Sequence, residues 1–189
     1  SAILLAKHLY GGLGYNPFNP AMVGYVVLLI SFPVQMTSWA PPRGVGEVPG
    51  FFAALQACFF PAGYDGATMA TPLDVLKQNN SLLIKDLWQQ NAQFGRWAGI
   101  GWEWANIAFL AGGVWLLYRK IFTWHAPVAM LVALAFMAAL FNDGGSSASG
   151  GSALFHLLSG ATMFGAFFIV TDPVSSAVSV RGRLIYGAL

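Results

Sequence analysis

Residues Ser159, Gly160, Ala161 and Thr162 place two hydroxyl groups on either side of two very small residues, within the apolar run 153–171. A serine or threonine hydroxyl can be the point at which a group is attached covalently. Small residues in an apolar helix also allow a neighbouring helix to approach closely, and Ala161 and Gly165 have the spacing used in such packing. The pattern leaves two interpretations open, and physical reasoning alone favours packing over attachment.

Polar side chains inside the apolar run 98–118 are a second candidate for chemistry. Glu103 and Asn106 lie in this run, and an ionisable group inside a membrane is a hypothesis for an ion or proton relay. Glu103 also follows Arg96 and Trp97 closely, near the end of the run. It can therefore equally belong to the membrane interface, where a carboxylate remains hydrated.

The remaining candidate side chains have structural explanations. Asp172 precedes Pro173 and is typical of a helix end, and Asp74 is expected to cap the helical stretch that follows it. His156 stands six residues before Thr162, on a roughly opposite face of a continuous helix, where we expect packing or a hydrogen bond. The histidines and the single cysteine show no spacing that would hold a metal ion or a haem.

The composition indicates an integral membrane protein. Of the 189 residues, 57% are hydrophobic and 8% are charged, whereas soluble domains carry about 25% charged residues. The mean hydropathy is +0.62. Nine basic and seven acidic residues give a net charge of +2 without a basic stripe, so we expect no nucleic-acid partner.

Three apolar runs are long enough to cross a bilayer, which takes about 20 residues. They cover residues 98–118, 121–141 and 153–171. The sequence therefore predicts an all-α, polytopic transmembrane protein that forms a single integral membrane domain over 1–189. The chain begins without a methionine and ends in an apolar run, so we expect it to be an internal portion of a longer chain.

The apolar stretch 21–34 is shorter than a membrane span, and Pro33 interrupts it. The Gly- and Pro-rich residues 11–20 before it neither continue a helix nor pair in a sheet. Two interpretations remain open. One is a broken or re-entrant helix near 11–34, which is tolerated where protein or a cavity satisfies its backbone. The other is a kinked helix after a surface loop.

Residues 40–96 form the extended polar region, and we expect an extramembrane loop there. Within it, leucines at helical spacing predict an amphipathic helix over 73–92. Residues 144–152 are low in complexity and predict a flexible, linker-like loop. Short loops rich in Arg and Lys remain in the cytoplasm, so residues 119–120 and 174–183 are predicted to be cytoplasmic, with 40–96 on the outer, periplasmic side.

Five stretches of the sequence resemble one known family, in the same order along the chain. They are 9–39, 70–74 (ATPLD), 98–117, 155–174 (which contains SGAT) and 181–189 (RGRLIYGAL). The family is RnfD, a membrane component of the Rnf electron-transport complex, which is related to the NqrB component of the sodium-translocating NADH:quinone reductase. The resemblance covers most of the chain that we expect to face the membrane.

The resemblance implies a covalent cofactor. In this family the threonine of the SGAT motif, here Thr162, carries FMN through a phosphoester, and a flavin transferase takes the FMN from FAD and releases AMP. Gly160 and Ala161 would leave room for the phosphate and the transferase, and Ser159 is a candidate hydrogen-bond donor to the phosphate. Related motifs often have an acidic residue three positions before the serine, where this chain has His156.

The resemblance also implies a setting. The family's complex couples electron transfer between ferredoxin and NAD to sodium or proton movement across the bacterial inner membrane, and RnfD alone catalyses no complete reaction. Expected partners are the other subunits of the complex, the flavin transferase and membrane lipid. A second, non-covalent flavin, riboflavin or FMN, occurs in related proteins, and NPFNPA (16–21) and Asp74 are candidates for its contacts.

Two alternatives from other classes remain open. A transporter or channel without redox activity would use the broken helix to line a path for its substrate. A structural subunit would anchor partners through its outer loop and leave Thr162 unmodified against another helix. Bound flavin distinguishes the electron-transfer subunit from both.

Overall fold

The computed structural model describes residues 2–9, 18–37, 45, 50–59, 71–79, 81–147 and 149–189. The predicted irregular backbone at 11–17 lies outside the described residues. So do parts of the polar region 40–96, including the charged residues Arg43, Glu47 and Asp65.

Helices make up the regular structure of the described residues. In chain order they are the π-helix η1 (Ala2–His8), α1 (Pro20–Ser31), α2 (Pro33–Thr37), α3 (Phe51–Phe59), α4 (Pro72–Gln78), α5 (Ile84–Gln90), α6 (Trp102–Tyr118), α7 (His125–Leu140), α8 (Ala153–Leu158), α9 (Thr162–Phe164), the π-helix η3 (Gly165–Ile169) and α10 (Val180–Ala188). The predicted all-α class is confirmed over these ranges. Within the same ranges, no helix combines the length and the apolarity needed to cross a membrane.

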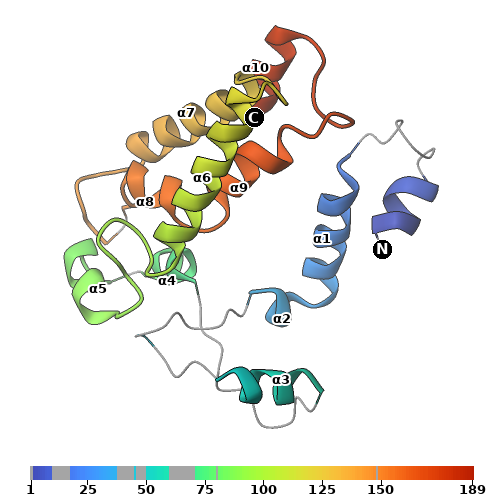
Figure 1. The fold of residues 1–189 in the computed structure, drawn as a ribbon. Helices are drawn as coiled ribbons and strands as arrows, with labels where there is room; N and C mark the ends of the chain where they lie inside the picture. The colour runs from blue at the N-terminus through green and yellow to red at the C-terminus, as the bar shows by residue number, and fades with distance from the viewer. Residues whose placement is uncertain are drawn as a thin grey trace.

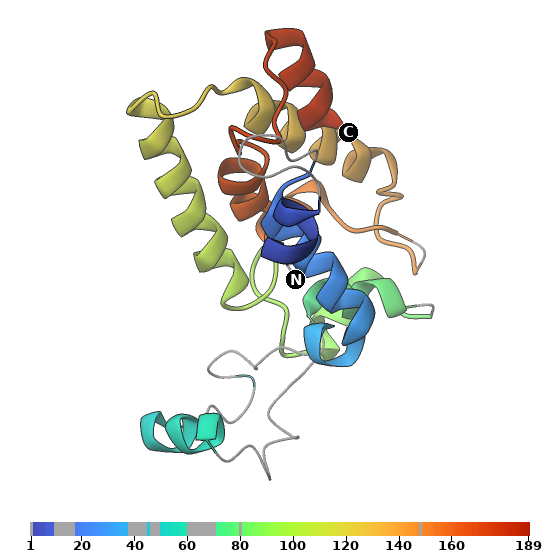
Figure 2. The same ribbon diagram turned by 90° about the vertical axis from the view of Figure 1, so that its right-hand side faces the viewer.

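Helices α4 to α10 form one group, while η1 and α2 each contact α1 and lie with it apart from that group in Figure 1. Figure 2 gives the same fold turned by 90°. Two clusters of buried apolar side chains hold the group together. The first consists of Leu76, Leu87, Phe94, Ala98 and Phe155. The second consists of Met163, Ala166 and Phe167. Leu158 packs against the first cluster and Leu157 against the second, so the end of α8 lies where the two clusters meet.

Helices α1 and α2 are separated by Phe32 alone. Asn19 caps α1, because its side-chain oxygen accepts hydrogen bonds from two backbone N–H groups of the first turn, at 2.9 and 3.4 Å. Pro33 has no N–H to continue the helical ladder, so α1 ends at Ser31 and a new helix begins at Pro33. The interruption predicted at Pro33 is confirmed.

Helix α4 begins with a reciprocal cap. The Thr71 hydroxyl accepts a hydrogen bond from the Asp74 N–H at 3.2 Å, and the Asp74 carboxylate accepts one from the Thr71 N–H at 3.4 Å. Two N–H groups that the first helical turn leaves without a partner are thereby satisfied. The predicted capping role of Asp74 is confirmed.

The single amphipathic helix predicted over 73–92 is wrong, because α4 and α5 are two separate helices. Asn79 closes the turn between them, since its side chain donates to the Leu82 carbonyl at 2.7 Å and accepts from the Leu82 N–H at 3.0 Å. An asparagine that bonds to the local backbone in this way competes with continued helix. The leucine pattern marks the buried face only in part, because Leu76 and Leu87 are 8% and 4% exposed whereas Leu83 is 53% exposed.

Two glycines set the closest helix contacts of the group. A Cβ atom at Gly113 in α6 would lie 2.3 Å from the Phe167 ring of η3, and one at Gly187 in α10 would lie 2.3 Å from the Ala126 carbonyl oxygen of α7. Both distances are below van der Waals contact, so a side chain at either position would push its helix away. The absence of a side chain therefore fixes how α6 meets η3 and how α10 meets α7.

The loop between α7 and α8 has specific partners. Gly144, Gly145 and Gly151 have positive φ, which favours glycine. The Gly145 carbonyl accepts from the Ile84 N–H at 3.2 Å, which ties the loop to the first turn of α5. A hydrogen bond from the Ser146 hydroxyl holds the pKa of the Asp143 carboxyl below its usual value.

Candidate functional site

The SGAT residues interrupt the third predicted span. Helix α8 ends at Leu158, Ser159 is extended, and Gly160 has a φ of +60° before α9 begins at Thr162. A left-handed residue cannot continue a right-handed helix, and glycine adopts this conformation without a Cβ clash. The continuous helix predicted over 153–171 is therefore wrong, and the break falls on the motif singled out from the sequence.

The Thr162 hydroxyl is held inside this break. It lies within hydrogen-bonding distance of the backbone carbonyls of His156 and Ser159, at 2.8 and 3.1 Å, and donates its one hydrogen toward them. Both acceptors lie on the α8 side, so the lone pairs of the hydroxyl oxygen are directed away from them. Thr162 is half-buried and the neighbouring Ala161 is exposed, so the motif reaches the protein surface at Ala161, directly beside Thr162.

The prediction that His156 lies opposite Thr162 is wrong for the backbone of His156, whose carbonyl accepts from the Thr162 hydroxyl. It assumed a continuous helix, whereas the break folds Thr162 back onto the His156 carbonyl. The imidazole itself is hydrogen bonded, because Nε2 lies 2.6 Å from the Gly150 carbonyl oxygen. The expected hydrogen-bonded histidine is confirmed.

The side chain of Asn106, in α6, is hydrogen bonded to backbone groups on both sides of the break. Its Nδ2 atom lies 3.0 Å from the Leu158 carbonyl, 2.9 Å from the Gly160 carbonyl and 2.9 Å from the Trp102 carbonyl of its own helix. Its Oδ1 atom accepts from the Met163 N–H at 3.1 Å. Asn106 is 1% exposed, so a single buried amide satisfies backbone groups on both sides of the interruption.

Ser159 is fully buried, and its Oγ atom has no hydrogen-bond partner among the residues that the structure describes. The role predicted for it, a hydrogen bond to a phosphate on Thr162, stays a prediction. In this structure Ser159 contributes its backbone carbonyl to the Thr162 hydroxyl instead. Gly160 is close to α4, because a Cβ there would lie 3.1 Å from Leu73.

A hollow of about 590 Å³ adjoins the α8 side of the break. It is lined by Leu73, Asp74, Leu76, Lys77, Asn79, Ser147, Ser149, Gly150 and His156. His156 thus contributes its ring to the hollow and its carbonyl to Thr162. Asp74, a candidate contact for a second flavin, lies in the same wall while it caps α4.

Glu103 and Asp172 have local backbone partners. The Oε1 atom of Glu103, in the first turn of α6, accepts from the N–H groups of Trp97 and Ala98 at 2.8 and 2.7 Å. Asp172 follows η3 and accepts from the Ser175 N–H at 3.0 Å, which confirms its predicted place at a helix end. Glu103 lies at the end of α6 rather than at its middle, as the interface interpretation expects.

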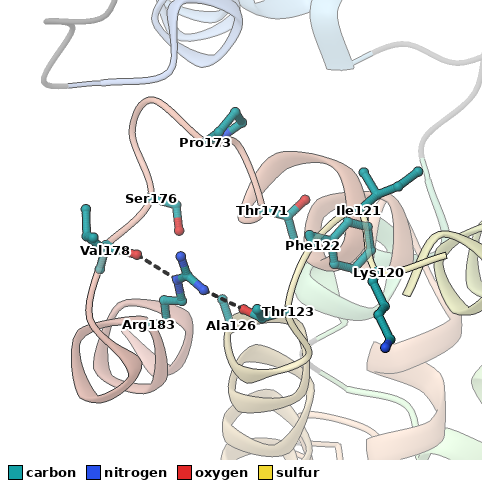
Figure 3. A pocket seen from close by; sticks show the side chains of 11 residues that line it. Lys120, Ile121, Phe122, Thr123, Ala126, Thr171, Pro173, Ser176, Val178 and Arg183 are labelled. Carbon is teal, nitrogen blue, oxygen red and sulfur yellow. Dashed lines mark hydrogen bonds between the residues drawn. The ribbon is translucent and has the colours of Figure 1, made fainter. Parts of the chain in front are cut away.

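A smaller cavity of about 230 Å³ lies between the turn after α6 and the loop before α10 (Figure 3). Arg183 spans its mouth, donating to the Ala177 carbonyl at 2.9 Å and to the Thr123 hydroxyl at 2.8 Å. None of the SGAT residues lines this cavity. The contact does bring together the two basic segments that were predicted to share one side of the membrane.

The chain belongs to the NQR2, RnfD, RnfE family, whose sequence model matches residues 1–189. The family resemblance stated from the sequence is confirmed.

Several relatives of this chain carry the same name. A protein of Cellvibrio japonicus (strain Ueda107), named as the D subunit of an ion-translocating oxidoreductase complex, is 63% identical over 193 positions, which cover 100% of this chain and 54% of that protein. Proteins of the same name from Ectopseudomonas mendocina (strain ymp) and Escherichia coli (strain SMS-3-5 / SECEC) are 59% and 50% identical. The match to the first covers 98% of this chain and 53% of that protein. The match to the second covers 100% of this chain and 57% of that protein. The chain thus spans about half the length of these relatives.

Sequence reasoning noted Asn106 only as a polar residue in an apolar run. Its partners lie more than 50 residues away along the chain, so no local pattern connects it to the SGAT motif. Its place in an otherwise apolar helix was the available signal for a structural role, because a buried amide requires hydrogen-bond partners.

Proposed function

We propose that this chain is the part of an ion-translocating oxidoreductase complex, within its D subunit, that carries FMN esterified to Thr162 and passes electrons. The names of its relatives support the complex. The observation that carries the attachment site is the Thr162 hydroxyl, held at a helix break next to the exposed Ala161.

The residues present fit a phosphoester. Attachment requires an oxygen that a second protein can reach, and the half-buried Thr162 stands next to the exposed Ala161. Its hydrogen points to backbone carbonyls, so the lone pairs of its oxygen are not used by these bonds. Gly160 and Ala161 present little bulk beside it. When bound there, FMN would supply reversible electron transfer, and the ester would fix its distance to the next carrier.

The transporter alternative has less support at this break. Broken helices in transporters bind cations through unwound backbone carbonyls. Here the carbonyls of Leu158 and Gly160 accept from Asn106, and those of His156 and Ser159 face the Thr162 hydroxyl. These four carbonyls therefore already accept hydrogen bonds from side chains of the protein.

The proposal includes a multi-pass protein in the bacterial inner membrane, in contact with lipid and with the other subunits. The family membership and the composition support this setting. The contact between Arg183 and Thr123 supports one shared side for the two basic segments, which the topology assigns to the cytoplasm. We extend the proposal to electron transfer between ferredoxin and NAD, to maturation by a flavin transferase, and to a second, non-covalent flavin.

Flavin fluorescence of the denatured protein tests the proposal. A covalent flavin survives denaturation, so the polypeptide from the full complex, made with its transferase, should fluoresce on a denaturing gel. Thr162→Ala should abolish the signal. Thr171→Ala is the matched control, because the Thr171 hydroxyl likewise donates to a backbone carbonyl, that of Phe167 at 2.7 Å. Fluorescence that persists in Thr162→Ala would contradict the site.

A further inference from the structure

We propose that Asn106 is a positioning residue for flavin attachment, which holds the SGAT break in the geometry that the transfer reaction requires. This inference rests on the proposed function. It assigns a role in the rate of maturation to a residue of a different helix, which does not touch the reacting oxygen.

The geometry identifies Asn106 as the residue that sets this backbone. Its amide has two hydrogens and one strong acceptor oxygen. The two hydrogens are shared among three carbonyls, those of Leu158 on the α8 side of the break, of Gly160 and of Trp102 in α6 itself. The oxygen accepts from Met163, immediately after Thr162. Thr162 therefore lies between two backbone groups that are fixed to α6.

Burial makes this arrangement restrictive. Asn106 is 1% exposed, so water cannot replace a lost bond without opening the site, and an unpaired backbone group there would be costly. Gly113, two turns further along α6, allows the Phe167 ring of η3 to approach the helix closely. Helix α6 thus fixes both the break and the segment that follows it.

The attachment reaction needs an accurately placed oxygen. The Thr162 Oγ attacks the FMN phosphorus of FAD, a new O–P bond forms, and the bond from that phosphorus to the bridging oxygen breaks. AMP leaves with the bridging oxygen, and the hydroxyl proton passes to a base of the transferase. A displacement of the attacking oxygen by about 1 Å can cost on the order of a hundredfold in rate.

The ester changes the bonding of Thr162 but leaves that of Asn106 intact. Once Oγ carries phosphorus it has no hydrogen to donate, so the carbonyls of His156 and Ser159 lose their donor. The bonds from Asn106 to Leu158, Gly160 and Met163 do not involve Oγ. Asn106 therefore holds the same break before and after flavin attachment.

The test is a time course of flavin attachment in the full complex, with the transferase and FAD added to membranes that contain the unflavinylated protein. Asn106→Asp has the same shape and keeps the acceptor for Met163 but loses both donors, and Asn106→Leu loses all partners. Asn142→Asp is the matched control, since Asn142 is exposed and lies in the α7–α8 loop. The rate constant reports positioning, whereas the final flavin content reports the fraction of folded protein.

We expect Asn106→Asp to lower the rate constant about tenfold or more, Asn106→Leu to lower it further, and Asn142→Asp to leave it unchanged. If Asn106→Leu reduces assembly, the isosteric Asn106→Asp carries the test. A wild-type rate constant in Asn106→Asp, whether the final flavin content is full or reduced, would overturn the positioning role. Wild-type protein that takes up no flavin would overturn the proposed function itself.

Discussion

The Oδ1 atom of Asn106 accepts a hydrogen bond from the backbone N–H of Met163 at 3.1 Å, although the two residues are 57 positions apart in the chain. This bond joins the N-terminal part of α6 to the residue that follows Thr162. The same side chain donates to the Gly160 carbonyl at 2.9 Å. One buried amide therefore supports the backbone on both sides of the proposed attachment residue.

Replacing Gly160 should destabilise the break. Gly160→Ala would place a Cβ on a residue with a φ of +60°, 3.1 Å from Leu73, and a left-handed conformation costs a non-glycine residue about 1–2 kcal/mol. We expect a lower thermal unfolding midpoint of the purified complex. Gly160→Asn should lower the unfolding midpoint less, because asparagine tolerates the left-handed conformation better than alanine. Equal stability of Gly160→Ala and wild type would contradict the left-handed turn.

Alanine substitution at two adjacent glycines of α6 should affect the stability of the protein differently. A Cβ at Gly113 would lie 2.3 Å from the Phe167 ring, whereas one at Gly112 would lie 3.6 Å from Phe168, at ordinary contact distance. Gly113→Ala should therefore destabilise by about 1–3 kcal/mol through overpacking. Gly112→Ala should be neutral or stabilising by up to about 1 kcal/mol, since alanine favours helix. Unfolding midpoints that show the reverse order would refute the packing of α6 on η3.

Glu103 should act through its hydrogen bonds to backbone rather than as an ion relay. Glu103→Gln keeps a side-chain oxygen for the N–H groups of Trp97 and Ala98, so the turn before α6 should persist and coupled ion transport by the full complex should be undiminished. Glu103→Ala removes both bonds and should lower stability by about 1–3 kcal/mol. Transport measured in vesicles decides the point, because loss of coupling in a stable Glu103→Gln complex would restore the relay hypothesis.

Local patterns in the sequence predict several features of the fold. The missing N–H of Pro33 and the capping pair Thr71 and Asp74 act within a few residues, so composition and spacing reveal them. The buried positions of Leu76 and Leu87 follow from their helical spacing. The separation of α4 from α5 was missed because the sequence allows Asn79 either to continue a helix or to close a turn. Its hydrogen bonds to Leu82 in the structure show that it closes a turn.

The candidate site was predicted in part. The SGAT motif was recognised as unusual, but an apolar run of 19 residues with two internal glycines is equally compatible with a continuous helix. What breaks it is the left-handed Gly160 together with Asn106, and Asn106 lies on another helix. A contact between residues so distant in the chain depends on tertiary packing, which no local pattern reports.

Covalent attachment of FMN is tested most directly by the mass of the peptide that contains Thr162. It should be isolated from the full complex produced in membranes together with its flavin transferase. We expect a mass increase of one FMN less one water, localised to Thr162 by fragmentation. An unmodified Thr162 peptide from such a preparation would contradict flavin attachment at this residue and leave the SGAT break with a structural role alone.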